Sequence, residues 1–231
     1  MKGLSETAAI VGSFEHPSRY APEKSEWQLM GEAARGAIED ADLTPGHVDA
    51  FFTAATRSEG GHLGTCAAIM AADYLGITPK FVDETDLGGA SFGYYVNRAV
   101  LGIRSGMFKC ALIAYGAETR SRGVNVGTVS YGELSQAPLI PIPDAFEQIY
   151  GTTVISFMGM LAQRYMHDYR LTEEELAAVA VTMREHAALN PEAFKREPIT
   201  VQDVLDSPLI ATPLHRLDCC VITDGAAALI V

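Results

Sequence analysis

The sequence predicts an α/β fold: a mostly parallel five-stranded sheet with helices on both faces, interrupted by an inserted, mostly helical segment. Short apolar runs alternate three times with longer helical patterns before Gly116, and the connections between them are short. The alternation stops over residues 117–222, which become rich in Gly, Ser, Pro and Tyr and then helical again. A final apolar run after Asp224 supplies the fifth strand, so residues 1–116 and 223–231 form the α/β domain around an insert.

The predicted strands and helices of the α/β domain follow one another in order along the chain. Strands are expected at four short apolar runs next to turn residues: Ala8–Val11, Val48–Phe52, Lys80–Val82 and Cys110–Tyr115. Helices are expected from the Ser25/Gln28 capping box, at Leu63–Leu75, and at about Ala90–Arg104. The third helix is apolar around almost its whole circumference, which is typical of a helix buried on all sides, and its Tyr95 is expected as a core or interface aromatic.

The insert is expected to contain three helices and an extended stretch. The first helix spans Ser156–Tyr169, the second begins at the Thr172/Glu175 capping box, and a short third helix spans Thr200–Leu205. An extended segment interrupted by two prolines follows, and leads back to the fifth strand.

Composition and charge restrict the range of partners. The formal net charge is −12, so the chain gains nothing from neutralising phosphates, and neither nucleic acid nor an anionic membrane is expected as a partner. The spacing of the four cysteines contains no CxxC pair, which favours free thiols in a reducing, cytoplasmic setting and gives no metal site. Glu6 interrupts any signal-peptide core, and no apolar stretch approaches the roughly 18 residues that a membrane span needs.

The glycine-rich turn Asp86–Ser91, between the third strand and the third helix, is the most informative local feature. Ligands of parallel sheets bind beyond the carboxyl ends of the strands, and this turn lies at such an end. Glycine allows both a tight change of direction and the close approach of a ligand to the backbone. Glu84 and Asp86 are acid–base candidates at the same end, although carboxylates are also ordinary residues there.

Several motifs give the chain a resemblance to the thiolase superfamily, and within it to sterol-carrier-protein thiolases and lipid-transfer-protein-like aldolases. Their order and spacing carry the resemblance: Ala8–Gly12, Gly88–Gly106, Ala114–Glu118, Phe157–Gly159, His186–Pro191, Leu217–Cys220 and Asp224–Ala228. The resemblance implies an acyl-CoA substrate, with coenzyme A as part of the substrate and no separate cofactor. It also implies that residues 117–222 are the loop domain over the acyl-CoA site. Phe157 and Met158 fall where thiolases commonly have His-Met, so Met158 is expected to contact the pantetheine arm and Phe157 to lie beside it.

The turn departs from the thiolase pattern at the position of the nucleophile. The resemblance places the nucleophilic cysteine of thiolases at Gly89, so the acyl-cysteine of the ping-pong reaction is not expected to form. The lipid-transfer-like aldolases have a similar Gly-Gly turn, which implies retro-aldol cleavage or the reverse aldol reaction of a β-hydroxyacyl-CoA. The expected active-site residues are therefore Gly88, Gly89, Ala90 and Ser91, with the thioester oxygen near the N–H groups of Gly89 to Ser91. Ser91 stays open as either a substitute nucleophile or a helix cap.

The resemblance covers only the first of the two similar halves of a thiolase. It implies that the C-terminal half, which carries the family's catalytic histidine, second cysteine and the tyrosines of the aldolase branch, is absent. That half would belong to a longer chain or to a separate partner. A homodimer through the thiolase fold is expected, with a small auxiliary subunit as a further partner. Two alternatives stay open: a non-catalytic acyl-CoA-binding or scaffold subunit, and an acyltransferase that takes its nucleophile from another segment.

Overall fold

The computed structural model describes residues 8–54, 67–85, 87–123 and 153–231, which fall into two compact units. The first unit contains the described residues up to Gly123 together with Thr223–Val231. The second unit contains residues 153–222 among those described. The first unit therefore continues past Gly116, through a turn that ends at Gly123.

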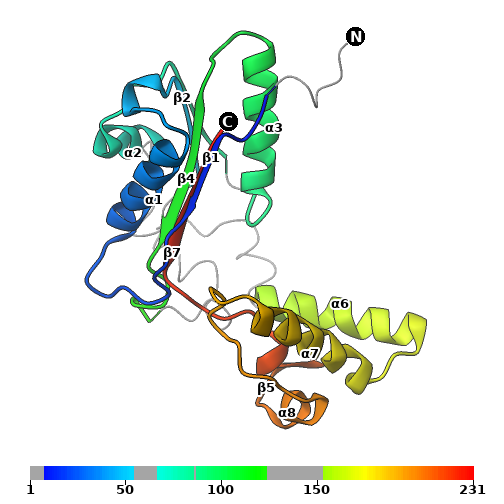
Figure 1. Cartoon of the computed structure of the whole chain (residues 1–231). Coiled ribbons are helices and arrows are strands. Elements are labelled where there is room, and N and C mark those ends of the chain that lie inside the picture. The colour runs from blue at the N-terminus through cyan, green and yellow to red at the C-terminus, as the bar shows by residue number, and fades with distance from the viewer. Residues whose placement is uncertain (1–7, 55–66, 86, 124–152) are drawn as a thin grey trace, which may run out of the picture. The chain divides into compact units, whose positions relative to one another are not determined.

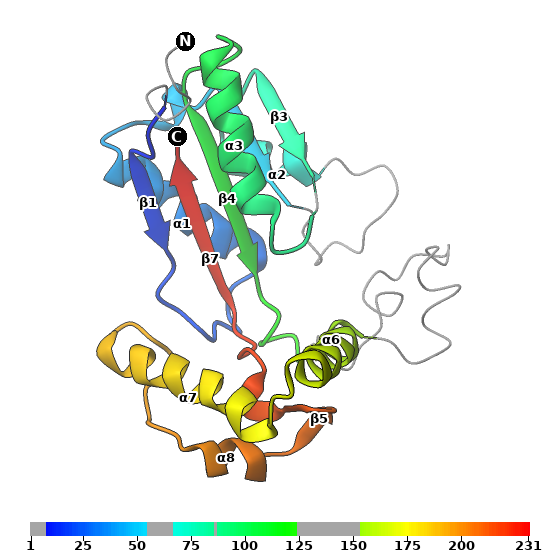
Figure 2. The same cartoon turned by 90° about the vertical axis from the view of Figure 1, so that its right-hand side faces the viewer.

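The first unit is built on a mixed sheet. Its strands are β1 (Gly12–Glu15), β2 (Ala50–Thr53), β3 (Phe81–Glu84), β4 (Ala111–Ala117) and β7 (Gly225–Ile230). They lie in the order β1-β7-β4-β2-β3, and the first three are seen face-on in Figure 2. β7 is antiparallel to both neighbours, whereas β2 is parallel to β3 and β4. All strands except β7 therefore point the same way, and their carboxyl ends share one edge of the sheet.

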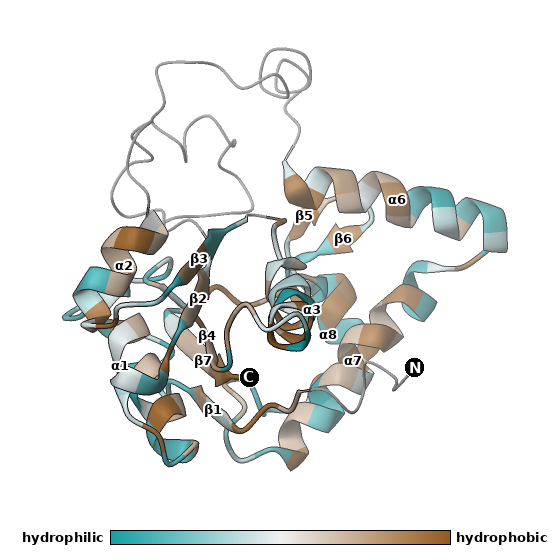
Figure 3. Cartoon of the chain, turned by 90° about the horizontal axis from the view of Figure 1, so that it is seen from above, coloured by the Kyte–Doolittle hydropathy of each residue, from teal (hydrophilic) through white to brown (hydrophobic). Residues whose placement is uncertain are grey.

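Helices cover both faces of this sheet, as the alternation in the sequence predicts. α1 (Glu26–Asp40) and α2 (Ala67–Leu75) lie on one face and α3 (Ser91–Arg104) lies on the other (Figure 1). Seen from above, the sheet separates α1 and α2 from α3, and hydrophobic residues are concentrated along the strands (Figure 3). The predicted α/β fold class is confirmed. The predicted start of α2 falls on residues 55–66, outside the described part of the chain.

α1 begins at the predicted capping box. The Ser25 hydroxyl accepts the Gln28 N–H at 3.3 Å, and the Gln28 side chain accepts the Ser25 N–H at 2.8 Å. The buried residues of the helix recur at helical spacing on the face toward the sheet: Glu26, Leu29, Met30, Ala33, Ala34, Ala37 and Ile38. The helix is thus held by its cap and by one continuous apolar stripe.

The predicted strand at Ala8–Val11 is wrong, because β1 begins only at Gly12. The sequence pattern makes Gly12 a strand end, but a Cβ at this position would lie 2.3 Å from the carbonyl oxygen of Ala37 on α1. Gly116 in β4 behaves in the same way, since its Cβ would lie 2.5 Å from the carbonyl oxygen of Glu26. Both glycines are therefore sheet residues over which α1 packs directly, and neither ends its strand.

The expectation that α3 is buried on all sides is not confirmed. Only one of its faces is fully buried, through Ser91, Tyr95, Ala99 and Gly102, whereas Leu101 is 47% exposed. The buried residues join the strands in one aromatic-rich cluster: Ala50, Phe52, Tyr95, Ala99, Phe108, Ala111, Ile113 and Val231. The helix is therefore not buried on all sides within the described residues, and Leu101 is its one exposed large apolar side chain there.

The second unit is mostly helical. It contains α6 (Val154–Tyr169), α7 (Glu173–Leu189), α8 (Val201–Asp206) and a two-stranded antiparallel sheet of β5 (Leu209–Ala211) and β6 (Leu214–His215). The Thr172/Glu175 capping box is present at the start of α7. The small sheet lies where the sequence predicts only an extended stretch. Within the described residues of both units, no helix has the length and apolar character to cross a membrane.

Candidate active site

The glycine turn connects β3 to α3 at the edge where the parallel strands end. Gly88 has a φ of +59°, which L-residues rarely adopt, so the backbone favours glycine here. Gly89 differs, because its φ is not positive and a Cβ placed on it meets no atom within 4 Å in the described part of the chain. Neither backbone geometry nor packing requires glycine at position 89, so the open space beside it calls for a functional explanation.

The N-terminus of α3 presents backbone donors to this open space. Ala90 occupies the N-cap position and has no side chain that accepts a hydrogen bond. The Ser91 N–H donates to the carbonyl of Gly88 at 3.1 Å, but the N–H groups of Gly89 and Ala90 bind no acceptor among the described residues. The positive end of the helix dipole lies at the same place, so an anionic oxygen would be stabilised there. Of the N–H groups of Gly89 to Ser91, which are expected near the thioester oxygen, those of Gly89 and Ala90 are therefore the better candidates.

Ser91 is buried and its hydroxyl is engaged within the turn. The oxygen accepts the Leu87 N–H at 2.8 Å, and the O–H donates to the carbonyl of Gly88 at 2.8 Å. Its relative exposure is 0%. A hydroxyl in this position caps the turn, which is the second of the two roles left open by the sequence. Its role as a nucleophile stays an untested prediction, and no contact described here supports it.

Tyr95, one turn further along α3, ties the turn to the sheet. Its hydroxyl accepts the Thr85 N–H at 2.7 Å, and its single proton is shared between the carbonyls of Thr53, at 2.7 Å, and of Thr85. The ring is fully buried and packs 5.5 Å from that of Phe52, centroid to centroid. Sequence reasoning places Tyr95 in the core correctly but misses the role of the hydroxyl. The available signal is its spacing of four residues from Ser91, which puts both on one face of the helix.

The titratable side chains nearest this edge are already engaged. The carboxylate of Glu84 accepts a backbone N–H from the first turn of α2 at 2.9 Å. His16, which follows β1 and is 3% exposed, has its Nε2 2.7 Å from a Glu32 oxygen, and its Nδ1 accepts the Ser18 N–H at 3.1 Å. With Nδ1 as acceptor, the ring proton lies on Nε2 and points to Glu32. Asp86 lies outside the described residues.

Asp224 is a further buried carboxylate that sequence reasoning did not single out beyond its motif. Its two oxygens accept the backbone N–H groups of Ala21 at 2.8 Å and of Arg120 and Ser121 at 2.9 Å each. Its own N–H donates to the carbonyl of Arg19 at 3.1 Å. Burial disfavours ionisation of the carboxyl, but these hydrogen bonds outweigh it and hold its pKa below the ordinary value. Asp224 therefore joins the segments that follow β1 and β4 to the start of β7.

Comparison with known proteins identifies the family of the chain. Residues 19–231 match the family described as the N-terminal domain of thiolase. The chain belongs to the thiolase family. It is 36% identical over 236 residues to a steroid side-chain-cleaving aldolase of Thermomonospora curvata, covering 100% of this chain and 58% of that protein.

Two further relatives are a lyase and an aldolase by name. A 17-hydroxy-3-oxo-4-pregnene-20-carboxyl-CoA lyase of Mycobacterium tuberculosis is 34% identical over 232 residues, which cover 99% of this chain and 58% of the lyase. The solved structure of an Ltp2-ChsH2(DUF35) aldolase superposes with a TM-score of 0.73 at 32% identity, covering 96% of this chain and 54% of that chain. This thiolase-family chain thus spans little more than half the length of the relatives it matches.

Phe157 and Met158, the expected acyl-CoA contacts of this thiolase-family chain, lie on α6 of the second unit. Their side chains are 37% and 50% exposed. The neighbouring Gly159 is buried, and a Cβ there would lie 2.8 Å from the carbonyl oxygen of Thr212. α6 therefore packs closely through Gly159 and leaves Phe157 and Met158 accessible, as contact with a ligand requires. Their contact with a pantetheine arm stays a prediction.

Two of the described thiols, Cys110 and Cys219, are poor candidates for a substitute nucleophile. Burial raises the pKa of the Cys110 and Cys219 thiols, which disfavours the reactive thiolate. Cys66 lies outside the described residues. Among the residues that the structure describes, no cluster of three or more His, Cys, Asp or Glu side chains is arranged to hold a metal ion.

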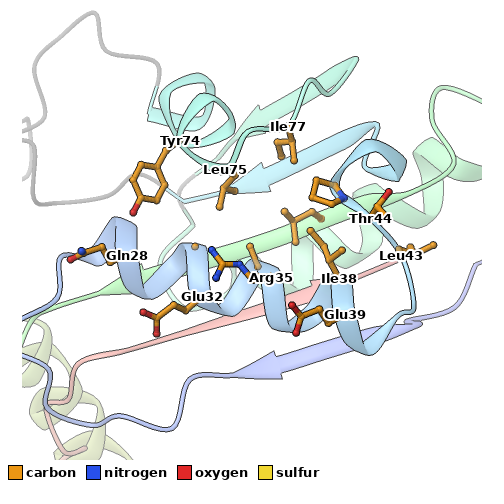
Figure 4. A pocket seen from close by; sticks show the side chains of 14 residues that line it. Gln28, Glu32, Arg35, Ile38, Glu39, Leu43, Thr44, Tyr74, Leu75 and Ile77 are labelled. Carbon is orange, nitrogen blue, oxygen red and sulfur yellow. The ribbon is translucent and has the colours of Figure 1, made fainter.

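A groove of about 450 Å³ lies elsewhere on the first unit, between α1 and α2. Figure 4 shows Glu32, Arg35 and Glu39 of α1 along one wall and Tyr74 and Leu75 of α2 along the other. None of the expected site residues lines this groove. Size alone therefore does not identify the site of this thiolase-family chain, and the turn with its backbone donors remains the better candidate.

Proposed function

We propose that this chain is the acyl-CoA-binding half of a thiolase-family lyase that cleaves, or in reverse forms, a carbon–carbon bond in a β-hydroxyacyl-CoA. The observation that carries the proposal is the turn at Gly89. Gly89, where the resemblance places the thiolase nucleophile, has no side chain, and a Cβ there meets no described atom within 4 Å beside the N–H groups of Gly89 and Ala90. A site that stabilises an oxyanion but offers no nucleophile suits a reaction without an acyl-enzyme.

In the proposed retro-aldol reaction, this half supplies the oxyanion donors and not the base. A base removes the proton of the β-hydroxyl, the Cα–Cβ bond breaks, and its electron pair passes into the thioester enolate. The β-carbon leaves as an aldehyde or ketone, and protonation of the enolate at Cα gives the shorter acyl-CoA. In the proposal, the N–H groups of Gly89 and Ala90 hold the enolate oxygen. The base comes from the C-terminal half, because the described side chains Glu84, His16 and Asp224 are engaged.

The names of the relatives suggest the acyl group. Two of them act, by name, on a steroid side chain and on a pregnene carboxyl-CoA ester. We infer that the acyl group here is also a steroid or a similarly large polycyclic residue. Its coenzyme A portion would lie against Phe157 and Met158, which are accessible on α6.

Partners form part of the same proposal. The unfilled outer side of α3 supports a C-terminal half that covers it, supplied by a longer chain or a second polypeptide. The aldolase structure with a ChsH2(DUF35) component supports a small auxiliary subunit. We also propose a homodimer through the thiolase fold, in a reducing cytoplasmic setting where the described free thiols Cys110, Cys219 and Cys220 persist.

The deciding experiment is incubation with a β-hydroxyacyl-CoA, with and without the polypeptide that supplies the second half, followed by mass spectrometry. Release of a shorter acyl-CoA and a carbonyl compound supports the proposal. Thiolysis that depends on added coenzyme A and yields a trapped acyl-enzyme contradicts it and favours the acyltransferase alternative. Tight coenzyme A binding with no turnover, even with the second half present, favours the non-catalytic subunit.

A further inference from the structure

The inner face of α3 carries two buried hydroxyls that hold opposite ends of the glycine turn. Tyr95 binds the backbone of Thr85, before the turn, through both its N–H and its carbonyl. Ser91 binds Leu87 and Gly88, inside the turn, through the N–H of the first and the carbonyl of the second. Both side chains are 0% exposed, so water does not compete for these hydrogen bonds.

Tyr95 has a wider reach than Ser91. Its hydroxyl also donates to the carbonyl of Thr53 at the end of β2, so it links two strand ends to α3. Ser91, by contrast, bonds only within the turn that it belongs to. The orientation of the turn relative to the sheet therefore depends on the Tyr95 hydroxyl.

The turn has few other anchors among the described residues. Gly88 and Gly89 have no side chains, Ala90 has only a methyl group, and Leu87 is 51% exposed. From α3, the Ser91 side chain binds the backbone of Leu87 and Gly88 directly. A loss of the Tyr95 hydroxyl leaves the Thr85 N–H and the Thr53 carbonyl without this buried partner.

We propose that Tyr95 is a positioning residue, which fixes the direction in which the N–H groups of Gly89 and Ala90 point. The inference rests on the proposed function of the turn as an oxyanion site. Tyr95 does not touch the substrate, because its hydroxyl is buried beneath the turn and is engaged by three backbone groups. It acts only through the backbone that it holds.

A thiol introduced by Gly89→Cys reports on these donors without any need for turnover. The substitution meets no described atom, and a thiol at the start of α3 should have a pKa below its usual value of about 8.5. The pKa is measured from the pH dependence of alkylation by iodoacetamide, with mass spectrometry of the peptide that contains position 89. This readout separates the introduced thiol from the four native ones.

Addition of Tyr95→Phe to Gly89→Cys should raise that pKa by about one unit, because the released N–H groups no longer converge on the thiolate. Phenylalanine keeps the ring contact with Phe52 and removes only the hydroxyl. The matched control is Phe108→Leu, a substitution in the same cluster beside Gly102 in the last turn of α3, which should leave the pKa unchanged. An unchanged pKa in the Tyr95→Phe variant would overturn the proposal.

Ser91→Ala measures the contribution of the other buried hydroxyl of α3. It releases Leu87 and Gly88 only, and should raise the thiol pKa by less than Tyr95→Phe does. A rise as large as that of Tyr95→Phe would overturn the proposal, because Ser91 would then fix the N–H groups.

In the complete natural enzyme, Tyr95→Phe should lower kcat about tenfold or more with little change in KM, since the oxyanion donors act mainly in the transition state. A raised KM with unchanged kcat would contradict the positioning role. If the thiol pKa responds to Tyr95 but the unsubstituted enzyme shows no lyase activity, the proposed function fails while the role of Tyr95 in the turn stands.

Discussion

Two regions at the same edge of the sheet are held by buried side chains of different chemistry. The glycine turn is held by the neutral hydroxyls of Ser91 and Tyr95. The junction where the chain leaves the first unit and returns to it is held by the carboxylate of Asp224, which accepts backbone N–H groups from segments up to 203 residues apart. Both clusters fix loops, but the anchoring side chain of the junction is charged, whereas Ser91 and Tyr95 are neutral.

The two kinds of anchor differ in which backbone N–H groups they bind. At the junction, Asp224 accepts the N–H groups of Ala21, Arg120 and Ser121, so these three donors are not left for an anionic ligand. At the turn, the hydroxyls bind the backbone without a charge, and among the described residues neither hydroxyl accepts the N–H group of Gly89 or Ala90. A fixed carboxylate beneath the turn would repel an enolate oxygen. Neutral anchors are thus suited to an oxyanion site, and charged anchors to a purely structural junction.

Asp224→Ala should give the largest loss of stability in this comparison. It leaves the Ala21, Arg120 and Ser121 N–H groups without their buried acceptor, which costs about 3–5 kcal/mol in the free energy of unfolding. Chemical denaturation followed by circular dichroism measures it, with Asp224→Asn as a matched control that keeps the shape and removes the charge. A loss below about 1 kcal/mol would show that the junction has other anchors.

Low pH should weaken the junction before the turn. Because the pKa of Asp224 is depressed in the folded chain, its contribution is fully present above the unfolded pKa of about 3.9 and is lost as the pH falls through the folded value. The difference in unfolding free energy between the unsubstituted chain and Asp224→Asn should therefore be constant near neutral pH and shrink below about pH 4. A difference that stays constant down to pH 2.5 contradicts the assignment.

Gly88→Ala should cost less, about 1–2 kcal/mol, because alanine at a φ of +59° is strained although no atom obstructs its methyl group. Thermal unfolding at neutral pH measures it. If the melting temperature is unchanged, the positive φ is not required and the turn adopts another conformation.

Gly89→Ala should have the smallest effect on stability, within about 0.5 kcal/mol, because neither φ nor packing opposes it. Under the proposed lyase function, and with the second half present, it should nevertheless reduce turnover strongly, since the methyl group enters the space proposed for the thioester. Comparison with Gly88→Ala by thermal unfolding and by the lyase assay separates the two glycines. Full activity of Gly89→Ala would move the substrate away from this turn.

The sequence predicts those parts of the fold that depend on the pattern of neighbouring residues. The capping boxes at Ser25 and Thr172 and the strand–helix alternation follow from spacing alone, and the structure confirms them. Gly12 and Gly116 mislead, because a glycine that ends a strand and a glycine that lies under a packed helix look the same in one sequence. Only the distance between α1 and the sheet distinguishes them.

In the candidate site, too, features of one continuous segment can be predicted from the sequence, whereas contacts between distant segments cannot. The place of the glycine turn between β3 and α3 follows from the sequence, because it belongs to one continuous segment, and its role in binding substrate stays a prediction. The Tyr95 network joins Thr53 to Thr85 across two strands, and the Asp224 network joins segments from opposite ends of the chain. Such contacts depend on which strands are neighbours, and residue spacing alone does not reveal this.

The open space beside Gly89 also has an evolutionary meaning. Because Ser91 and Tyr95 hold the turn, residue 89 contributes nothing to its shape, and selection can exchange it without rebuilding the fold. Codons for glycine and cysteine can differ by a single base. A lineage with this scaffold is therefore one point mutation away from gaining or losing a thiol at the start of α3, and with it the chance to change reaction type while its architecture is inherited intact.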